Sequence, residues 1–322
     1  MLSRLIALLS TPRPSVALAI SAASVRGVAI GSVKSTVQVI GHSVVSLPRG
    51  AVEPTAAAVN IADCDTVSAA VREVIRNLPG RGTRIGLVVP DCVGKVSFVR
   101  LDQVPSNEEE LRQLVAWQVR KSLPFPIEDA QFEYVPGQRL SDGGREFIVG
   151  VIRRDIVEEY EGVCRAAGVY AGLVDLSAFN VINVASSKST DENKDWILVH
   201  MMDCYSTVAL IRGDDVVLLR TLNATTGDDV AAAIHQSAMF YEDQLKGHGV
   251  SRAVLIRSDD SLVELDGVES RMKEQFNVPV ERVGSRKDFL LTGLDVDTVD
   301  AFAAPLGLVI RDERLPFFGV GS

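Results

Sequence analysis

The sequence predicts an α/β fold built from two similar halves, and a repeated layout supports that prediction. A strand, a tight turn and a second strand occupy residues 16–30, and the same layout recurs at residues 196–211. In each copy a third strand follows and the chain then enters a helix. Apolar runs bounded by turn residues, Ile85–Val89 and Ala253–Ile256, indicate a buried strand at the centre of each half.

The first half continues from its three strands into a helix at residues 66–78, which Pro79 and Gly80 end. A distinct segment then begins with an alternating strand at residues 95–101. Ser106 precedes Glu109 by three residues, a capping-box spacing that predicts the start of a helix. One face of this helix is apolar, and Pro124-Phe125-Pro126 ends it, since proline lacks a backbone donor. Two further strands (130–135, 146–152), a helix (155–167), a strand (169–173) and a helix (177–185) return the chain toward the first half.

Residues 186–194 are polar and form the best candidate linker. The second half then repeats three strands, with a hairpin turn at residues 212–215, and Thr226 and Asp229 cap a long helix that reaches Lys246. The remaining elements expected are a strand (253–256), a helix (261–276), a strand (278–283) and a closing helix (298–308).

Composition limits the function classes. The chain has 322 residues, 47% of them hydrophobic, and a formal net charge of −9 without a long basic stripe, which argues against nucleic acid as a main partner. The four cysteines never form a C-x-x-C pair, so zinc and thioredoxin-like sites are excluded and a reducing cytosol fits best. The four histidines have no metal-ligand spacing.

No apolar run reaches the roughly 20 residues that a membrane-spanning helix needs. At the N-terminus, four apolar residues fall on one face of a predicted helix: Leu2, Leu5, Ile6 and Leu9. Residues 1–10 therefore form either a peripheral membrane or partner contact, or a terminal helix that packs on its own domain.

Two halves that face one another form the cleft of an actin-like nucleotide-binding fold. The expected organisation is a first core domain at residues 1–92 and 151–188, an inserted α+β subdomain at residues 93–150, and a second core domain at residues 189–322. Such clefts hold phosphate with glycine-rich hairpin turns and hold the metal with a carboxylate at a strand end. Neither turn of this chain contains a glycine.

A specific resemblance begins in the inserted segment. Residues 102–111 (DQVPSNEEEL) and 117–126 (WQVRKSLPFP) resemble the type IV pilus assembly protein PilM family, which has a Pro-Ser-x-x-Glu-Leu opening and a helix ending in Pro-Phe-Pro. Weaker matches occur in the same order at residues 24–26 (SVR), 237–241 (SAMFY) and 304–308 (APLGL). The resemblance implies a cytoplasmic, FtsA-related, actin-like protein at the inner-membrane face. It also implies binding of the N-terminal cytoplasmic peptide of PilN, an inner-membrane protein.

The chain departs from that family in the cleft. Relatives read Asp-x-Gly-Ser-x-Ser at the first turn, where this chain has Ala19 and Ser21 in place of the aspartate and the glycine. The family Asp-x-Gly of the second turn becomes His200-Met201-Met202, and the Gly-Gly pair at the adenosine pocket is replaced within residues 257–260. We therefore expect no metal and no ATP, and predict a protein that is not an enzyme. The candidate ligand contacts that remain are Ser21, Ser24, Arg26 and Asp203.

The sequence thus predicts a scaffold that grips a PilN-like peptide in a groove between the first core domain and the inserted subdomain. The predicted wall of this groove is one helix face and the segment after it: Leu111, Leu114, Val115, Leu123 and Phe125. The alternative for these residues is that the face packs on neighbouring strands. The alternatives for the whole protein are an ATP-binding switch or ATPase of pilus assembly, and a GspL-like scaffold of type II secretion.

Overall fold

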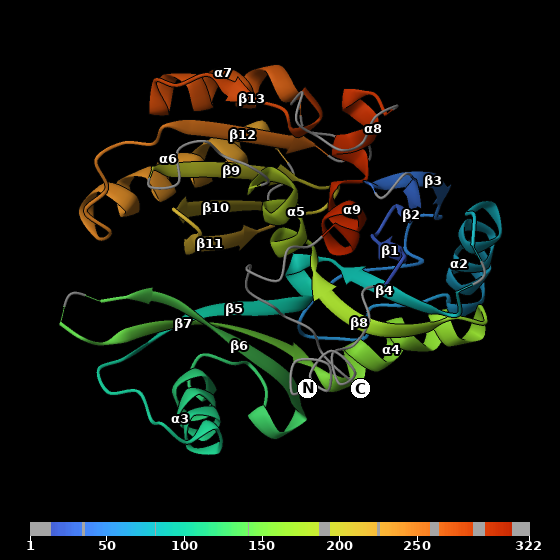
Figure 1. Ribbon diagram of the computed structural model, residues 1–322, viewed down its shortest axis with the longest axis horizontal. Helices are drawn as coiled ribbons and strands as arrows, with labels where there is room; N and C mark the ends of the chain where they lie inside the picture. The colour runs from blue at the N-terminus through green and yellow to red at the C-terminus, as the bar shows by residue number, and fades with distance from the viewer. Residues whose placement is uncertain are drawn as a thin grey trace.

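Two five-stranded sheets with the same strand order dominate the structure, a computed structural model (Figure 1). It describes residues 14–33, 36–80, 82–140, 142–186, 194–223, 226–257, 264–285 and 294–310. The first sheet has the order β3-β2-β1-β4-β8 and contains β1 (Val16–Ile20), β2 (Ser24–Val33), β3 (Thr36–Ser46), β4 (Arg84–Val89) and β8 (Tyr170–Leu176). The second has the order β11-β10-β9-β12-β13 and contains β9 (Asp195–Met201), β10 (Ser206–Arg212), β11 (Asp215–Leu222), β12 (Arg252–Arg257) and β13 (Val280–Glu281).

The repeated layout predicted from the sequence is confirmed by the pairing of the strands. In the first sheet β1 pairs antiparallel with β2 and parallel with β4, and in the second sheet β9 pairs antiparallel with β10 and parallel with β12. The register places Ala19 opposite Arg26 in one sheet and His200 opposite Thr207 in the other. Ala19 and His200 are therefore equivalent positions of the two copies.

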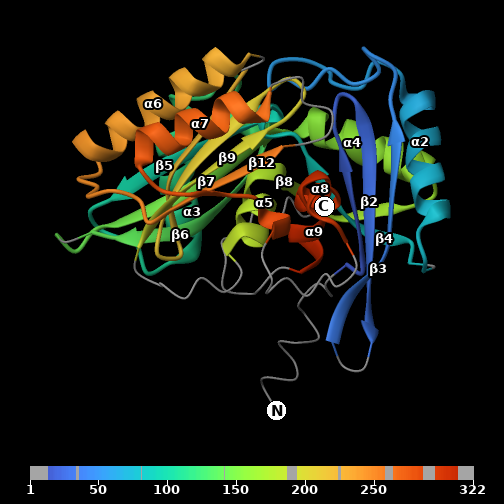
Figure 2. The same ribbon diagram turned by 90° about the horizontal axis from the view of Figure 1, so that it is seen from above.

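Helices cover the outer faces of both sheets. On the first sheet lie α2 (Cys64–Asn77) and α4 (Arg154–Ala166), and on the second lie α6 (Gly227–Asp243) and α7 (Leu265–Phe276). Figure 2 shows α6 and α7 side by side on one flank of the molecule and α2 on the opposite flank. We call the first sheet with α2 and α4 the first lobe, and the second sheet with α6 and α7 the second lobe.

Three helices occupy the space between the lobes: α5 (Ser177–Ser186), α8 (Val296–Ala301) and α9 (Ala303–Val309). The last of these packs on α5, β1 and β4, and Gly307 lies so close to Asn180 that a Cβ would fall 1.8 Å from its carbonyl oxygen. The C-terminal helix α9 thus returns to the first lobe, whereas the sequence pattern predicts a second core domain over residues 189–322. Amphipathy predicts that this helix is buried but not which sheet it covers.

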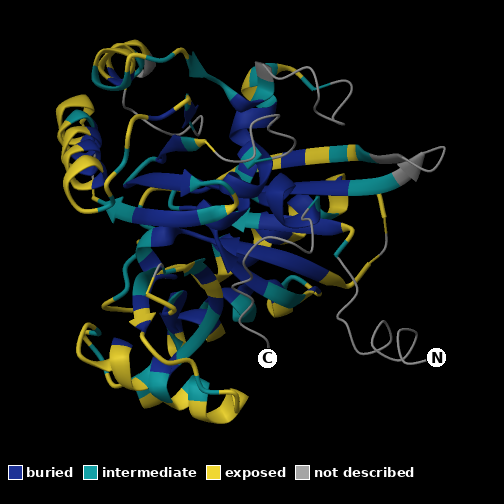
Figure 3. Ribbon diagram, turned by 60° about the vertical axis from the view of Figure 1, so that its left-hand side comes forward, coloured by how far each residue is buried: buried dark blue, intermediate teal, exposed yellow. Residues whose placement is uncertain are grey.

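One apolar core runs through both lobes. Its members in the first lobe, such as Leu18 and Leu87, are in one cluster with Leu198 and Ile256 on the inward face of the second sheet. A second cluster fills the space between the second sheet and α6 and α7. Figure 3 shows the buried strands through the centre of the molecule and the exposed residues on the outer helices. The lobes are therefore joined by apolar packing, in addition to the chain connections.

The inserted subdomain is a third, smaller layer. Its sheet has the order β5-β7-β6 and contains β5 (Gly94–Leu101), β6 (Ala130–Arg139) and β7 (Arg145–Arg153), with α3 (Glu108–Arg120) packed against it. It has a core of its own that includes Val115, Val119 and Phe147. The three-residue 3₁₀ helices η1 (Asp91–Val93), η2 (Ile127–Asp129) and η3 (Val283–Ser285) lie in connections between these elements.

The helix caps test two sequence predictions. Thr226 and Asp229 form the capping box predicted for α6. For α3 the predicted capping box at Ser106 is wrong, because Asn107 is the N-cap and its side chain accepts from the backbone N–H groups of Glu109 and Glu110. Serine and asparagine are both good N-caps, so composition alone does not decide between two neighbouring positions.

Candidate functional site

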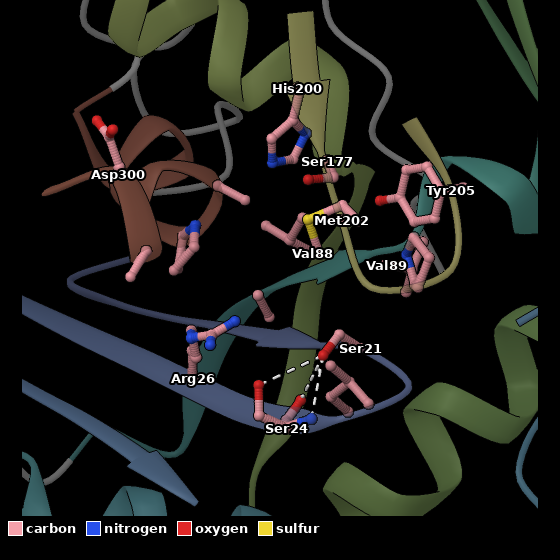
Figure 4. Close-up of a pocket in the computed structure, with 16 residues that line it drawn as sticks. Ser21, Ser24, Arg26, Val88, Val89, Ser177, His200, Met202, Tyr205 and Asp300 are labelled. Atoms are coloured by element: carbon pink, nitrogen blue, oxygen red, sulfur yellow. Dashed lines mark hydrogen bonds between the residues drawn. The ribbon is translucent and has the colours of Figure 1, made fainter. Parts of the chain in front are cut away.

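The two hairpin turns face each other across the space between the lobes. They enclose a cavity of about 30 Å³, lined from the first lobe by Ser21, Ser24 and Arg26 and from the second by His200 and Tyr205 (Figure 4). Small-molecule sites usually measure about 300–1,000 Å³. A single water takes up roughly 10–15 Å³ of such a cavity volume. The cavity therefore has room for about two waters, which is far less than a nucleotide requires.

The first turn is closed by the side chain of Ser21. Its Oγ accepts hydrogen bonds from the backbone N–H groups of Ala23 at 3.3 Å and Ser24 at 3.1 Å. The N–H of Ser21 itself donates to the carbonyl oxygen of Ser24 at 2.9 Å. Backbone N–H groups in such a turn are the donors that would bind a phosphate. Here a hydroxyl of the same turn already uses two of them.

The second turn has the same backbone hydrogen bond but different side chains. The N–H of Met202 donates to the carbonyl oxygen of Tyr205 at 2.9 Å, the counterpart of the Ser21–Ser24 bond. The Met202 side chain and the Tyr205 ring point into the space between the turns, and Tyr205 is only 1% exposed. Bulky side chains thus occupy the region where the second lobe would approach a ligand.

Arg26 and His200 come from equivalent sheets and are both buried. Burial, with a smaller effect from the positive charge of Arg26, lowers the pKa of His200 to about 4. The imidazole is therefore neutral at pH 7. The site has one fixed positive charge from Arg26, while the carboxylate of Asp300, which also lines the cavity, is paired with Arg282 at 2.7 Å.

Asp91 links the two lobes beside this cavity. It follows β4, and its carboxylate accepts from the N–H of Ala178 in α5 at 2.7 Å and from the hydroxyl of Thr207 in β10 at 2.8 Å. Burial raises the pKa of Asp91 to about 6, although these two hydrogen bonds lower it in part. The only sequence signal for Asp91 is its position two residues after a buried central strand, and it was not among the predicted site residues.

The structure separates the predicted ligand contacts into two places. Ser21, Ser24 and Arg26 line the small cavity together, whereas Asp203 lines a different and larger one. That second cavity measures about 630 Å³ and lies between the two turns, represented by Ala22 and Ala23 of the first and Asp203 and Cys204 of the second, and the segment at residues 47–59. Asp203 also accepts from the N–H of Cys204 at 3.0 Å, so its carboxylate helps to hold its own turn.

Metal binding receives no support from the described ranges. They contain no group of three or more His, Cys, Asp or Glu side chains placed to hold an ion. Ala19, near the end of β1, has no side-chain oxygen that could bind a metal. Residues 257–260, which stand where the family has the Gly-Gly pair of the adenosine pocket, lie outside the described residues apart from Arg257. The predicted N-terminal helix at residues 1–10 and most of the predicted linker also lie outside the described residues.

The predicted partner residues all lie on the inserted subdomain. Val115 is fully buried, and the other four are half-buried against the sheet of that subdomain: Leu111, Leu114, Leu123 and Phe125. Val115 therefore packs α3 against the core of the subdomain, whereas Leu123 and Phe125, which follow the helix, remain partly exposed to solvent. Trp117, on the outer face of α3, is 58% exposed, and the Lys121 ammonium lies 5.4 Å from its ring centre.

Comparisons with known proteins identify relatives of this chain. A sequence model of a family described as type IV pilus assembly protein PilM matches residues 17–244. A solved structure titled as a PilM-PilN type IV pilus biogenesis complex has a TM-score of 0.76 at 16% identity, covering 93% of this chain and 99% of that one. A Bacteroides thetaiotaomicron protein with an actin-like ATPase fold and unknown function has a TM-score of 0.51 at 10% identity, covering 90% and 95%. The search of curated proteins finds no significant match. The predicted actin-like fold is thus confirmed.

Proposed function

Because this chain belongs to the type IV pilus assembly protein PilM family, we propose that it works as a scaffold that binds a peptide and does not hydrolyse ATP. The peptide is the N-terminal cytoplasmic segment of a PilN-like inner-membrane protein. The similar structure is titled as a complex of PilM with PilN, which supports this choice of partner. No helix in the described part of the chain has the length and apolar character needed to span a bilayer. In this proposal the partner holds the protein at the inner-membrane face.

The closed cleft is the single observation that most favours a scaffold over an ATPase. A cavity of about 30 Å³ leaves no room for a nucleotide among the inward-facing side chains Ser21, Arg26 and His200 in this conformation. Ser21 uses the N–H groups of its own turn, and Met202 and Tyr205 fill the opposite side. Binding ATP would require both turns to open and a carboxylate to be supplied from elsewhere.

We place the peptide contact at the end of α3. Leu123 and Phe125 are half-buried there and Trp117 is exposed, so the surface offers apolar side chains beside the charge of Lys121. Peptide grooves bind through a few such anchors, and aromatic residues contribute most among them. The inserted subdomain has its own core, so this surface is held rigidly.

The test for ATP is calorimetric titration with ATP and Mg²⁺, combined with thermal unfolding. We expect no heat and no change in Tm at millimolar ATP. A ligand at ten times its Kd stabilises a protein by about 1.4 kcal/mol, which such a scan detects. Magnesium-dependent binding would contradict the closed cleft and favour an ATP-dependent switch.

The test for the partner is a titration with a synthetic peptide that has the sequence of the N-terminal cytoplasmic segment of a PilN-like protein. We expect the fluorescence of exposed Trp117 to change, and Phe125→Ala to weaken binding about tenfold, equivalent to ~1.4 kcal/mol. Tyr170→Ala is the control, because Tyr170 is an exposed aromatic residue, at 59%, that lies on β8 of the first lobe. Equal losses in both variants, or no binding at all, would contradict this surface without bearing on the ATP result.

A further inference from the structure

Two buried polar atoms of the small cavity have no hydrogen-bond partner within the described ranges. They are the hydroxyl oxygen of Ser177, at the start of α5, and Nδ1 of His200, near the end of β9. Ser177 is 3% exposed and His200 is 2% exposed, so solvent at the surface does not reach them. Leaving a buried polar atom unpaired destabilises a protein, and such atoms in folded proteins usually face an ordered water or a ligand. The cavity therefore has the polar walls of a binding site.

Arg26 gives the same cavity a positive charge. Figure 4 shows its guanidinium group turned into the space that His200 and Ser177 face from the other side. Arg26 is 5% exposed. Burial, with a smaller effect from the Arg26 charge, lowers the pKa of His200, which agrees with a positive charge close to the ring. A guanidinium group has N–H donors and no acceptor, so it favours a negatively charged acceptor beside it.

The two carboxylates near the cavity are bound to other groups. Asp300 lines the cavity, but its Oδ2 accepts from the Arg282 guanidinium at 2.7 Å and its Oδ1 accepts from the N–H of Gly284 at 3.2 Å. Figure 4 shows this carboxylate pointing away from Arg26. Asp91 is not among the residues that line the cavity, and each of its oxygens already accepts a hydrogen bond. The charge that faces the cavity is therefore positive.

The size of the cavity selects the kind of anion. About 30 Å³ holds roughly two waters, so one monatomic anion with a water fits there, whereas a phosphate or a carboxylic acid does not. A water alone would also satisfy Ser177 and His200. The attraction of a buried guanidinium nevertheless favours an anion at the same position, because the low dielectric of the interior screens the charge weakly. Chloride is the monatomic anion that is most abundant in biological solutions.

We propose that this cavity binds a chloride ion between the Arg26 guanidinium of the first lobe, the Ser177 hydroxyl and the His200 ring of the second lobe. The hydroxyl donates to the ion, and the neutral imidazole donates through Nδ1 in the tautomer that carries its hydrogen there. Because the ion joins side chains of both lobes, it stabilises their closed arrangement by mass action. This inference concerns an inorganic ligand and does not depend on the proposed peptide partner or on ATP.

The first experiment compares thermal unfolding of the full chain in sodium chloride and in sodium gluconate at equal ionic strength and pH 7. Gluconate is far too large for a cavity of about 30 Å³, so it controls for the screening of surface charges. We expect the Tm to rise with chloride concentration and then saturate, by roughly 2 °C at ten times the Kd. Bromide should replace chloride. The same Tm in both salts at every concentration would rule out the ion.

Variants assign the response to the cavity. Arg26→Gln should abolish the chloride-dependent rise in Tm, and Arg26→Lys should keep part of it because the charge remains. Arg49→Gln is the matched control, since Arg49 is an exposed arginine that lines the larger cavity, and it should respond like the natural chain.

Because Arg26→Gln can impair folding, crystals of the natural chain grown in sodium bromide decide the question independently. We expect an anomalous signal from bromide beside the Arg26 guanidinium. Water alone in the cavity, or a chloride response that survives in Arg26→Gln, would overturn the proposal. So would an equal loss of the response in Arg49→Gln.

Discussion

The turns of the two lobes share a backbone hydrogen bond but are filled by side chains of opposite character, polar in the first and apolar in the second. Each has a 2.9 Å hydrogen bond between equivalent backbone groups, Ser21 to Ser24 in the first and Met202 to Tyr205 in the second. The first turn is closed by a small hydroxyl that bonds to its own N–H groups, and the second by a thioether and a buried aromatic ring. One turn is thus filled by internal hydrogen bonds, and the other by apolar packing.

This difference teaches that a duplicated fold can keep the backbone geometry of its two turns while the side chains that fill them differ. The strands on either side of each turn still pair in the same register, because that register depends on the sheet and not on the turn. Buried donors in the first turn still need acceptors, and Ser21 supplies one. The second turn instead fills its space, which avoids the cost of an empty cavity.

The largest expected effect is in the second turn. Tyr205→Ala should lower the free energy of unfolding by about 3–5 kcal/mol, because it removes a fully buried ring. Ser24→Ala, the equivalent change in the first lobe, should cost about 1 kcal/mol or less. Urea unfolding of both variants measures the difference.

Tyr205→Phe serves as the control for the ring. The Tyr205 hydroxyl has no well-formed hydrogen-bond partner among the described residues, so this change should alter stability by less than about 1 kcal/mol. Equal losses for Tyr205→Ala and Ser24→Ala would refute the contrast between packing and hydrogen bonding.

The next effect concerns Asp91 and His200, which titrate in opposite senses. The folded pKa of Asp91 is raised to about 6, so the folded state binds the extra proton and stability falls as pH rises from 3.8 to 6. The folded pKa of His200 is lowered to about 4, so stability falls as pH drops from 6.5 to 4. Their contributions oppose each other over most of this range.

Asp91→Asn should therefore be more stable than the natural chain at pH 7, by on the order of 2 kcal/mol, since it removes a buried charge. The advantage should shrink as the pH falls from 6 to 4. Urea unfolding of both chains across this range gives the difference curve. A difference that is independent of pH would show that Asp91 ionises freely in the folded protein.

The smallest effect is in the first turn. Ser21→Ala should cost about 1 kcal/mol, because the N–H groups of Ala23 and Ser24 lose their acceptor. Ser21→Gly frees the same groups and opens space, yet ATP should still not bind, because Met202 and Tyr205 fill the other side. Titration of the glycine variant with ATP and Mg²⁺ checks this, and binding there would make Ser21 alone responsible for the closed cleft.

Much of the fold was predictable because its signals are local. Alternation and short apolar runs identified the strands, and the repeated strand-turn-strand layout identified the duplication. The capping box of α6 was correct because threonine and aspartate act within one turn of helix. The α3 cap was missed by one residue for the same local reason, since two adjacent residues compete for the role.

The site was only partly predictable because its members meet through packing between the lobes. Ser21, Ser24 and Arg26 line one cavity because they lie in or next to one turn, whereas Asp203 lines another. Asp91, Tyr205 and Thr207 come together only when the lobes close on each other. The role of Phe125 and its neighbours in binding a partner stays a prediction.

The position of α9 has a consequence for how the chain is made. The first lobe begins with β1, but its core is completed by residues 303–309 near the end of the chain. During synthesis the chain leaves the ribosome from its N-terminus, and contacts between distant segments form slowly. The first lobe thus cannot finish folding until α9, which follows every strand of the second sheet, has emerged. Truncation before α9 would expose the apolar surface of β1, β4 and α5 that this helix covers.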